Sequence, residues 1–215
     1  MPSEKENTVK VMTTNIYKLH PWHGVDIGSE APEMVTAFIE IIPSDTVKYE
    51  IDKHSGYLKV DRPQKFSNIV PALYGFIPQT YCAEDVAILN MASTGRTGIK
   101  GDGDPLDILV LTEREITHGD ILVKAIPIGG FRLIDDNEAD DKIIAVLKND
   151  DIYGLWTDIN DVPVTIINRL KHYFLTYKQM PDKQPTCIID EVYGKNAAYE
   201  VINASISDYH HHYRR

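Results

Sequence analysis

The sequence predicts a mainly β domain of barrel or sandwich type, with helices confined to its C-terminal part. Short β-rich runs follow one another from residue 37 to residue 147, with turn residues between them and no helical pattern alternating with them. Helical spacing of apolar residues begins only after residue 163. A parallel sheet built from βαβ units is therefore not expected.

The strands are expected in chain order, with one clear hairpin near the start. The runs at 47–51 and 57–62 flank a turn at 52–56, and strand alternation places Lys48 and Glu50 together on one face. The remaining runs are short and separated by turn residues, which is typical of a small barrel or sandwich. The expected strands cover residues 37–42, 47–51, 57–62, 108–112, 121–130 and 142–147.

Two helices are expected near the C-terminus. The first covers residues 163–179, where Pro163 suits a first turn. The second covers residues 196–212, with Asn196 as a candidate N-cap. Apolar residues recur at helical spacing at Val164, Ile167, Leu170 and Phe174 in the first helix. Ala198, Ile202, Ile206 and Tyr209 are expected to form the inward stripe of the second.

The other segments suggest one domain with two additions. Residues 1–35 show weak periodicity and are expected to form an N-terminal arm, with Trp22 as a docking contact. Residues 81–100 are expected to be an irregular surface loop. No linker interrupts residues 36–215, which are expected to form a single domain.

The composition indicates a globular protein that binds neither nucleic acid nor membranes. The chain has 215 residues, of which 43% are hydrophobic, and its formal net charge is −10. Binding to nucleic acid or anionic membranes needs clustered Lys and Arg. No run approaches the ~18 apolar residues of a membrane helix, and the N-terminus lacks the apolar core of a secretory signal. Since Cys82 and Cys187 form no disulfide or metal pattern, a cytoplasmic location is expected.

Three aspartates crowd together where a core strand is expected to begin. The stretch KGDGDPLDILVL, residues 100–111, contains Asp102, Asp104 and Asp107. A solvated turn is one explanation, because Asp, Gly and Pro all favour turns. Asp107 argues against it, since a lone charge within an apolar run is costly to bury. A divalent cation would neutralise the cluster, but an EF-hand does not fit, because Asp107 stands where that loop requires Gly.

Further carboxylates and a few cations extend this pattern. Residues 135–142, DDNEADDK, form a second acidic stretch, and Glu40 stands between two isoleucines. Alone, the stretch fits a solvated loop and Glu40 a solvent-facing strand position. Two acidic clusters beside core strands favour a shared metal site, in which metals and cations would hold a small polyanionic phosphate. The candidate cations are Lys48, Arg62, Lys142 and Lys178.

These motifs together resemble the soluble family I inorganic pyrophosphatases of bacterial type. The D-x-D-P-x-D motif at 102–107 follows the hairpin VKYEIDKHSGYLKVDR at 47–62. The resemblance runs from about Glu40 to Lys178 and implies a five-stranded OB-like closed β-barrel with flanking α-helices. It also implies that residues 36–215 form a catalytic domain that hydrolyses pyrophosphate to two orthophosphates. Further matching stretches are VPALYGFIPQ (70–79), DDNEADDKIIAV (135–146) and HYFLTYK (172–178).

The same resemblance implies a role for each site residue. Several Mg²⁺ ions per site are implied as cofactors, with Mn²⁺ or other divalent ions as substitutes. Asp104 would be the general base beside the attacking water. The metal ligands would be Asp102, Asp107 and Asp140, joined by Asp135 and Glu40 for the metals that arrive with substrate. Phosphate contacts would come from Lys48, Arg62, Lys142, Tyr177 and Lys178, with Tyr74, Glu50 and Asp136 as further site positions.

The chain departs from the family pattern in three places. Val70 stands where many bacterial relatives have a tyrosine, so one hydroxyl is absent or supplied elsewhere. Residues 81–100 look like an insertion relative to compact bacterial members. The interval from Glu40 to Lys48 is one residue shorter than in some relatives. Compact bacterial members form hexamers, so a homo-oligomer is expected, but the arm and the insertion leave its size open.

Two other functions stay open at this point. A hydrolase of organic pyrophosphates, such as nucleotides, would need a base-stacking pocket, and turnover of pyrophosphate against ATP would distinguish it. A non-catalytic protein that binds divalent ions or phosphate would explain the aspartates. It would not explain why Lys48, Arg62 and Lys178 should surround them, and it predicts metal binding without phosphate release.

Overall fold

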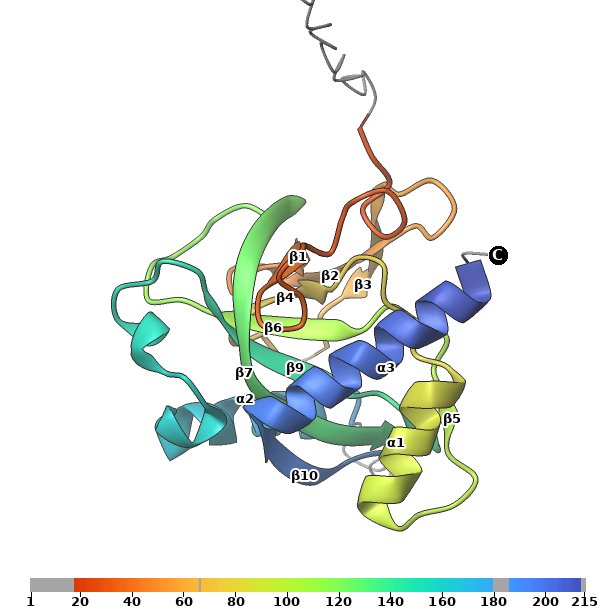
Figure 1. Cartoon of the computed structure of the whole chain (residues 1–215). Coiled ribbons are helices and arrows are strands. Elements are labelled where there is room, and N and C mark those ends of the chain that lie inside the picture. The colour runs from red at the N-terminus through yellow and green to blue at the C-terminus, as the bar shows by residue number, and fades with distance from the viewer. Residues whose placement is uncertain (1–17, 66, 180–185, 214–215) are drawn as a thin grey trace, which may run out of the picture.

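A closed barrel of five strands forms the centre of the molecule (Figure 1). The computed structural model describes residues 18–65, 67–179 and 186–213. The strands pair in the ring order β1–β4–β6–β9–β7, and β7 pairs back to β1. The predicted OB-like barrel is therefore confirmed. Its strands are β1 (Val35–Ile41), β4 (Leu73–Phe76), β6 (Asp107–Leu111), β7 (Ile121–Asp135) and β9 (Lys142–Leu147).

One parallel pair fixes the position of two charged residues. Strands β6 and β9 run parallel, whereas the other neighbouring strands of the barrel run antiparallel. The register pairs Asp107, the first residue of β6, with Lys142, the first residue of β9. Because parallel strands begin at the same edge of a sheet, both residues lie at one rim of the barrel.

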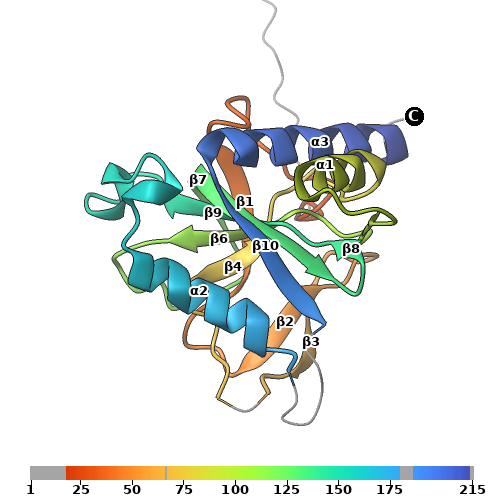
Figure 2. The same ribbon diagram turned by 90° about the horizontal axis from the view of Figure 1, so that it is seen from below.

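Shorter elements surround the barrel, and the helices cover two of its sides. Figure 2 shows α3 and α1 on one side of the barrel and α2 on the opposite side. The hairpin of β2 and β3 forms its own sheet, while β10 pairs with β7. The strands are β2 (Val47–Ile51), β3 (Leu58–Pro63), β5 (Lys100–Gly101), β8 (Glu138–Ala139) and β10 (Cys187–Gly194). The helices are α1 (Glu84–Thr94), α2 (Val164–Thr176) and α3 (Lys195–Tyr213), with 3₁₀ turns η1 (Tyr153–Leu155) and η2 (Ile159–Asp161).

The apolar core has two main parts, one under each helical layer. Ile202 of α3 packs with Ile39 of the barrel in the first part. Leu170 and Phe174 of α2 pack with Ile144 in the second part. Each such side chain contributes roughly 1.5–3 kcal/mol when fully buried. The barrel is thus held from both sides, which leaves its rim as the place for polar chemistry.

Most predicted elements are present, with differences that have local causes. The strands at 47–51 and 142–147 are confirmed, whereas β4 and β10 were not predicted. The prediction that Asn196 is an N-cap is wrong, because α3 already begins at Lys195. The backbone N–H of Lys195 donates instead to the carboxylate of Asp158, at 2.8 Å. Asp158 lies 37 residues before Lys195 in the chain, so local sequence patterns do not indicate this cap.

The prediction of an irregular segment at 81–100 is wrong, because helix α1 lies within it. No side chain of the segment itself caps the start of this helix. The buried carboxylate of Asp208 in α3 accepts hydrogen bonds from three backbone N–H groups there, at 2.9–3.1 Å. Long-range capping therefore stabilises a helix that its own sequence barely signals.

The described part of the N-terminal arm docks onto the domain as expected. Trp22 is 2% exposed and packs with Phe76 and Tyr209 in a small third cluster. Its indole Nε1 donates to the carbonyl oxygen of Thr80 at 2.8 Å. Residues 1–17 of the predicted arm lie outside the described residues.

The cap of α1 yields a test of stability. Asp208→Ala should lower the free energy of unfolding by about 2–3 kcal/mol, because it leaves buried N–H groups of α1 without an acceptor. Asp208→Asn, which keeps one acceptor oxygen, should lose less. Urea unfolding followed by circular dichroism measures both, and equal stability of Asp208→Ala and the parent chain would contradict this account of α1.

Candidate active site

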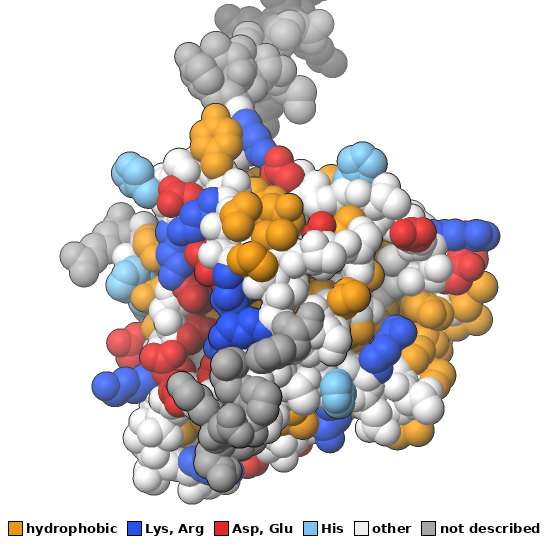
Figure 3. Space-filling view, turned by 180° about the vertical axis from the view of Figure 1, so that it is seen from behind, with side chains coloured by type: hydrophobic (Ala, Val, Ile, Leu, Met, Phe, Trp, Pro, Cys, Tyr) orange, Lys and Arg blue, Asp and Glu red, His pale blue; other side chains and the backbone are white. Residues whose placement is uncertain are grey.

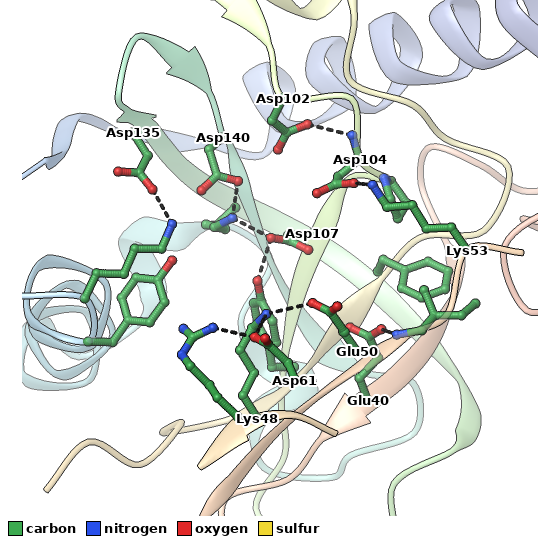
Figure 4. A pocket seen from close by; sticks show the side chains of 18 of the residues that line it. Glu40, Lys48, Glu50, Lys53, Asp61, Asp102, Asp104, Asp107, Asp135 and Asp140 are labelled. Atoms are coloured by element: carbon green, nitrogen blue, oxygen red, sulfur yellow. Dashed lines mark hydrogen bonds and ion pairs between the residues drawn. The ribbon is translucent and has the colours of Figure 1, made fainter. Parts of the chain in front are cut away.

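A cavity of about 730 Å³ opens at the rim where β6 and β9 begin. Acidic and basic side chains gather side by side on this face of the molecule (Figure 3). Figure 4 shows how they point toward one another across the cavity. The predicted site residues that line it are Glu40, Lys48, Glu50, Arg62, Tyr74, Asp102, Asp104, Asp107, Asp135, Asp140, Lys142, Tyr177 and Lys178.

The first acidic cluster comes from β6 and the loop before it. Tyr74 of β4 donates its hydroxyl proton to Asp107 Oδ2 at 2.5 Å. Asp102 accepts a hydrogen bond from the backbone N–H of Asp104 at 2.9 Å, which shapes the loop. Gly101 is required here, because a Cβ would lie 2.3 Å from the carbonyl oxygen of Cys82. Close backbone packing thus helps to direct the carboxylates of Asp102 and Asp107 into the same cavity.

Lys142 ties the first cluster to the second. Its side chain is only 2% exposed, and its ammonium group donates to both Asp107 and Asp140 (Figure 4). Burial alone would lower the pKa of Lys142, but the negative charges of Asp107 and Asp140 outweigh it and raise the pKa. The lysine therefore stays charged and sits between the two carboxylates.

The carboxylates of Asp102 and Asp140 favour a nearby cation. Burial, followed by the charge of Asp140, raises the pKa of Asp102. Burial also raises the pKa of Asp140, and the charge of Asp107 adds to this, although Lys142 opposes it. Ionising both groups is costly without further positive charge.

The donor set fits divalent cations that prefer oxygen ligands. All carboxylates of the cavity offer hard oxygen donors, as Mg²⁺ requires. Within the described residues, no three Asp, Glu, His or Cys side chains converge closely enough to hold an ion as they stand. Lysine ammonium groups instead neutralise the carboxylates, as with Lys178 on Asp135. Cations would bind here by moving these lysines toward an anionic ligand.

Glu40 connects the barrel to the β2–β3 hairpin. Its Oε1 accepts the backbone N–H of Ile51 at 2.6 Å, and the residue is 6% exposed. Burial raises the pKa of Glu40 to about 8, against the opposing effect of that hydrogen bond. Glu40 is thus a buried carboxyl group on the cavity wall, not a solvent-facing strand residue.

The cations on the hairpin side are organised by a residue that the sequence reasoning missed. Lys48 and Arg62 stand opposite each other on β2 and β3, and both donate to Asp61. Lys48 donates to Asp61 at 2.9 Å and to Glu50 at 3.2 Å. Asp61 could have been suspected from its place beside Arg62 on a strand facing the acidic motif.

Two more missed residues lie in the cavity lining. Lys53, in the hairpin turn, donates to Asp104, and Tyr173 of α2 presents a phenol beside Tyr177. The turn composition around Lys53 gave no functional signal, and Tyr173 lies within the matching stretch HYFLTYK but was assigned no role there. Val70 is fully buried in the core and does not line the cavity, so it supplies no polar group there.

The structure does not bring Asp136 to the cavity. Asp136 and Asn137 form a two-residue turn between β7 and β8, with φ of 49° and 68°. Positive φ at both positions is typical of a type I′ hairpin, which suits Asp and Asn. Asp136 is exposed, and Glu138 on the far side of the turn lines the cavity.

Comparison with known proteins decides the family. The model of a protein family described as inorganic pyrophosphatase matches residues 37–210. The chain belongs to the inorganic pyrophosphatase family. It is 51% identical over 196 residues to the inorganic pyrophosphatase of Chlamydia muridarum, covering 89% of this chain and 94% of the relative. It is 36% identical over 194 residues to soluble inorganic pyrophosphatase 2 of Chlamydomonas reinhardtii, with 90% of both chains covered.

A solved structure of the pyrophosphatase family supports the same assignment. The crystal structure of the inorganic pyrophosphatase of Thermus thermophilus aligns with a TM-score of 0.74 at 30% identity. The alignment covers 89% of this chain and 99% of that one. Membership of the pyrophosphatase family implies dependence on divalent metal ions in general. Among the helices of the described residues, none combines the length and apolar character needed to cross a membrane.

Glu40 gives a pH-dependent prediction for the metal-free pyrophosphatase fold. Folded Glu40 keeps its proton up to about pH 8, whereas its ordinary pKa is 4.5. The folded state therefore binds more protons in this window, so this contribution to stability is present below pH 4.5 and is lost as pH rises toward 8. In EDTA at pH 8, Glu40→Gln should be more stable than the parent by about 4 kcal/mol.

The pH series supplies its own control. The Glu40→Gln variant would keep the acceptor for Ile51 without the charge, so its advantage over the parent should vanish near pH 4.5. Urea unfolding at several pH values measures the difference. A stability difference independent of pH would show that Glu40 is not held protonated by its surroundings.

Proposed function

We propose that this chain hydrolyses inorganic pyrophosphate to two orthophosphates, with Mg²⁺ as the preferred divalent ion and Mn²⁺ or others as substitutes. One observation carries the proposal: two acidic clusters and several Lys and Arg side chains face one cavity at the barrel rim. Carboxylates alone would suit a site for metal cations. Lys and Arg side chains alone would suit a site for an anion. Their combination suits a small polyanion that binds together with metal ions.

In this proposal Asp102, Asp107 and Asp140 hold the activating metals, and Asp135 and Glu40 help with those that accompany substrate. When bound, divalent cations would activate water as a nucleophile and offset the charge of the phosphates. The hydrogen bond from Tyr74 orients Asp107, and Thr186 Oγ1 donates to Asp135 at 2.8 Å. These contacts orient the carboxylate oxygens before any ion arrives.

Asp104 is proposed as the group that accepts a proton from the attacking water. Its side chain is half exposed and pairs with Lys53 at the cavity edge. A carboxylate at such an edge can reach a water molecule and also exchange its proton with solvent. Lys53 would have to turn away for Asp104 to act as a base.

The basic side chains are proposed to bind the phosphate oxygens and stabilise the leaving phosphate. Arg62 and Lys48 approach from the hairpin, while Lys178 and Tyr177 approach from the end of α2. Lys142 lies between them at the barrel rim. Substrate oxygens would replace the carboxylates that these groups now contact, which leaves those carboxylates available for cations.

Asp104→Asn tests the proposed reaction. Orthophosphate release from pyrophosphate with Mg²⁺ should fall by about 10²–10⁴-fold, the usual contribution of a general base. Excess EDTA should abolish release by the parent chain. The matched control is Asp136→Asn, which changes an exposed aspartate outside the cavity and should leave release within about threefold of the parent.

Two other experimental outcomes would favour a different function for this chain. Faster turnover of ATP than of pyrophosphate would favour a hydrolase of organic pyrophosphates. Tight Mg²⁺ binding by the folded chain without phosphate release would favour a non-catalytic binding protein.

We further infer a cytoplasmic homo-oligomer, with residues 36–215 as one catalytic domain and residues 1–35 as its arm. Two buried free cysteines fit a reducing compartment. Exposed apolar side chains on η1 and at the start of α2 suit contact with another copy: Leu155 is 76% exposed and Val164 is 68% exposed.

Light scattering tests the oligomer. The mass in solution should be a multiple of 24.3 kDa. Leu155→Asp should reduce that mass, because it places a charge in the apolar contact. The control Asn160→Asp alters another exposed position nearby and should not change the mass. A parent chain of 24.3 kDa in solution would rule out the oligomer.

A further inference from the structure

A buried ion pair lies next to the cavity in the chain but does not line it. Arg132 of β7 donates from Nη1 to Asp141 Oδ2 at 3.1 Å, and the two side chains are 2% and 0% exposed. Asp141 stands between Asp140 and Lys142, both of which line the cavity. Neither member of the pair has a part in the proposed reaction.

The hydrogen-bonding capacity of this ion pair is only partly used, which is unfavourable for a contact that only stabilises the fold. Among the described residues, Arg132 Nε and Asp141 Oδ1 are buried without a hydrogen-bond partner, as is the Tyr193 hydroxyl. The Tyr193 ring centre lies 4.6 Å from the guanidinium carbon, and Glu191 Oε2 lies 3.9 Å from Nε. Buried pairs with unmet hydrogen bonds are often no more stabilising than apolar side chains of similar size. Stability alone therefore does not account for this pair.

The ion pair lies at the two-residue junction between β8 and β9, opposite β7. The backbone N–H of Asp140 donates there to the carbonyl oxygen of Leu133 in β7 at 3.0 Å. Asp140 and Asp141 separate β8 from β9 and belong to neither strand. Successive side chains of extended chain point to opposite sides. With Asp141 turned inward to Arg132, the side chains on either side of it are directed to the cavity, where Lys142 donates to Asp140.

We propose that Arg132 and Asp141 are positioning residues for the cation site. Their ion pair holds the Asp141 side chain on the side away from the cavity, so that Asp140 and Lys142 face each other and the cavity in one arrangement. This inference rests on the proposed function, in which Asp140 holds a divalent cation. Groups that orient metal ligands without touching the metal commonly change metal affinity by about 10–100-fold when they are removed.

The main test removes both charges together. Arg132→Met combined with Asp141→Val leaves no buried charge unpaired. The double variant should fold, as judged by circular dichroism, and its Kd for Mg²⁺ should be weakened about tenfold or more. Isothermal titration calorimetry without pyrophosphate measures this affinity, so the readout does not depend on activity. At saturating Mg²⁺, kcat should return to within about threefold of the parent, because the ligands themselves remain.

A conservative variant and a matched control complete the design. Arg132→Lys keeps a cation near Asp141 but loses the fixed guanidinium geometry, so its Mg²⁺ Kd should weaken less, by about threefold. If the double variant does not fold, the Mg²⁺ Kd of Arg132→Lys decides whether the ion pair positions the cation site. Asp150→Asn alters another carboxylate with strong backbone contacts, including Glu113 and Tyr153 N–H at 2.7 Å, outside the cavity lining. It should lower stability without changing the Mg²⁺ Kd.

The outcomes separate this inference from the proposed reaction. An unchanged Mg²⁺ Kd in the folded double variant, or in Arg132→Lys if the double variant is unfolded, overturns the positioning role. A weakened Kd in Asp150→Asn as well would assign the effect to general loss of stability and also overturns it. If the parent chain binds Mg²⁺ but releases no phosphate, the proposed reaction fails, while the comparison of Kd values still decides the positioning role.

Discussion

Repulsion between carboxylates at one rim of a closed barrel is the constraint on which the site depends. Parallel pairing of β6 with β9 fixes Asp107 beside Lys142, and the junction between β8 and β9 adds Asp140. Lys142 keeps its charge because both carboxylates surround it, and they tolerate burial because it is there. The three groups are mutually dependent, because Asp107 and Asp140 share the ammonium group of Lys142 as their ion-pair partner.

This arrangement requires a rigid support, and the two helical layers supply it. The cores under α2 and α3 clamp the barrel from opposite sides (Figure 2), so the rim carries polar groups without contributing much apolar burial. The hairpin of β2 and β3 contacts the barrel at its turn end, where Glu40 accepts the backbone N–H of Ile51 and Lys53 donates to Asp104. The cavity therefore has one wall on the barrel rim, which carries Asp107 and Asp140, and one wall on the hairpin, which carries Lys48 and Arg62.

Local chemistry in the sequence was sufficient to predict four of the five barrel strands, all but β4, and, together with the family resemblance, much of the cavity lining. Asp102, Asp104 and Asp107 stood out because charges interrupt an apolar run, and the resemblance to a family supplied partners such as Tyr177. Tertiary effects were not predictable in this way. Helix α1 depends on a distant acceptor, and Lys53 reaches Asp104 only because the hairpin folds over the motif. Asp136 has the residue type of a site position, but a tight turn directs it to solvent.

The cap of α1 also sets an order of events during synthesis. Asp208 lies 125 residues after Ala83, whose N–H it accepts, so the ribosome must synthesise α3 before this helix has its cap. Cys82, beside that helix, exchanges backbone hydrogen bonds with Gly103 and Asp104 at 3.0 and 2.9 Å. The backbone that holds the aspartate loop therefore adjoins a helix that receives its cap only when α3 is present.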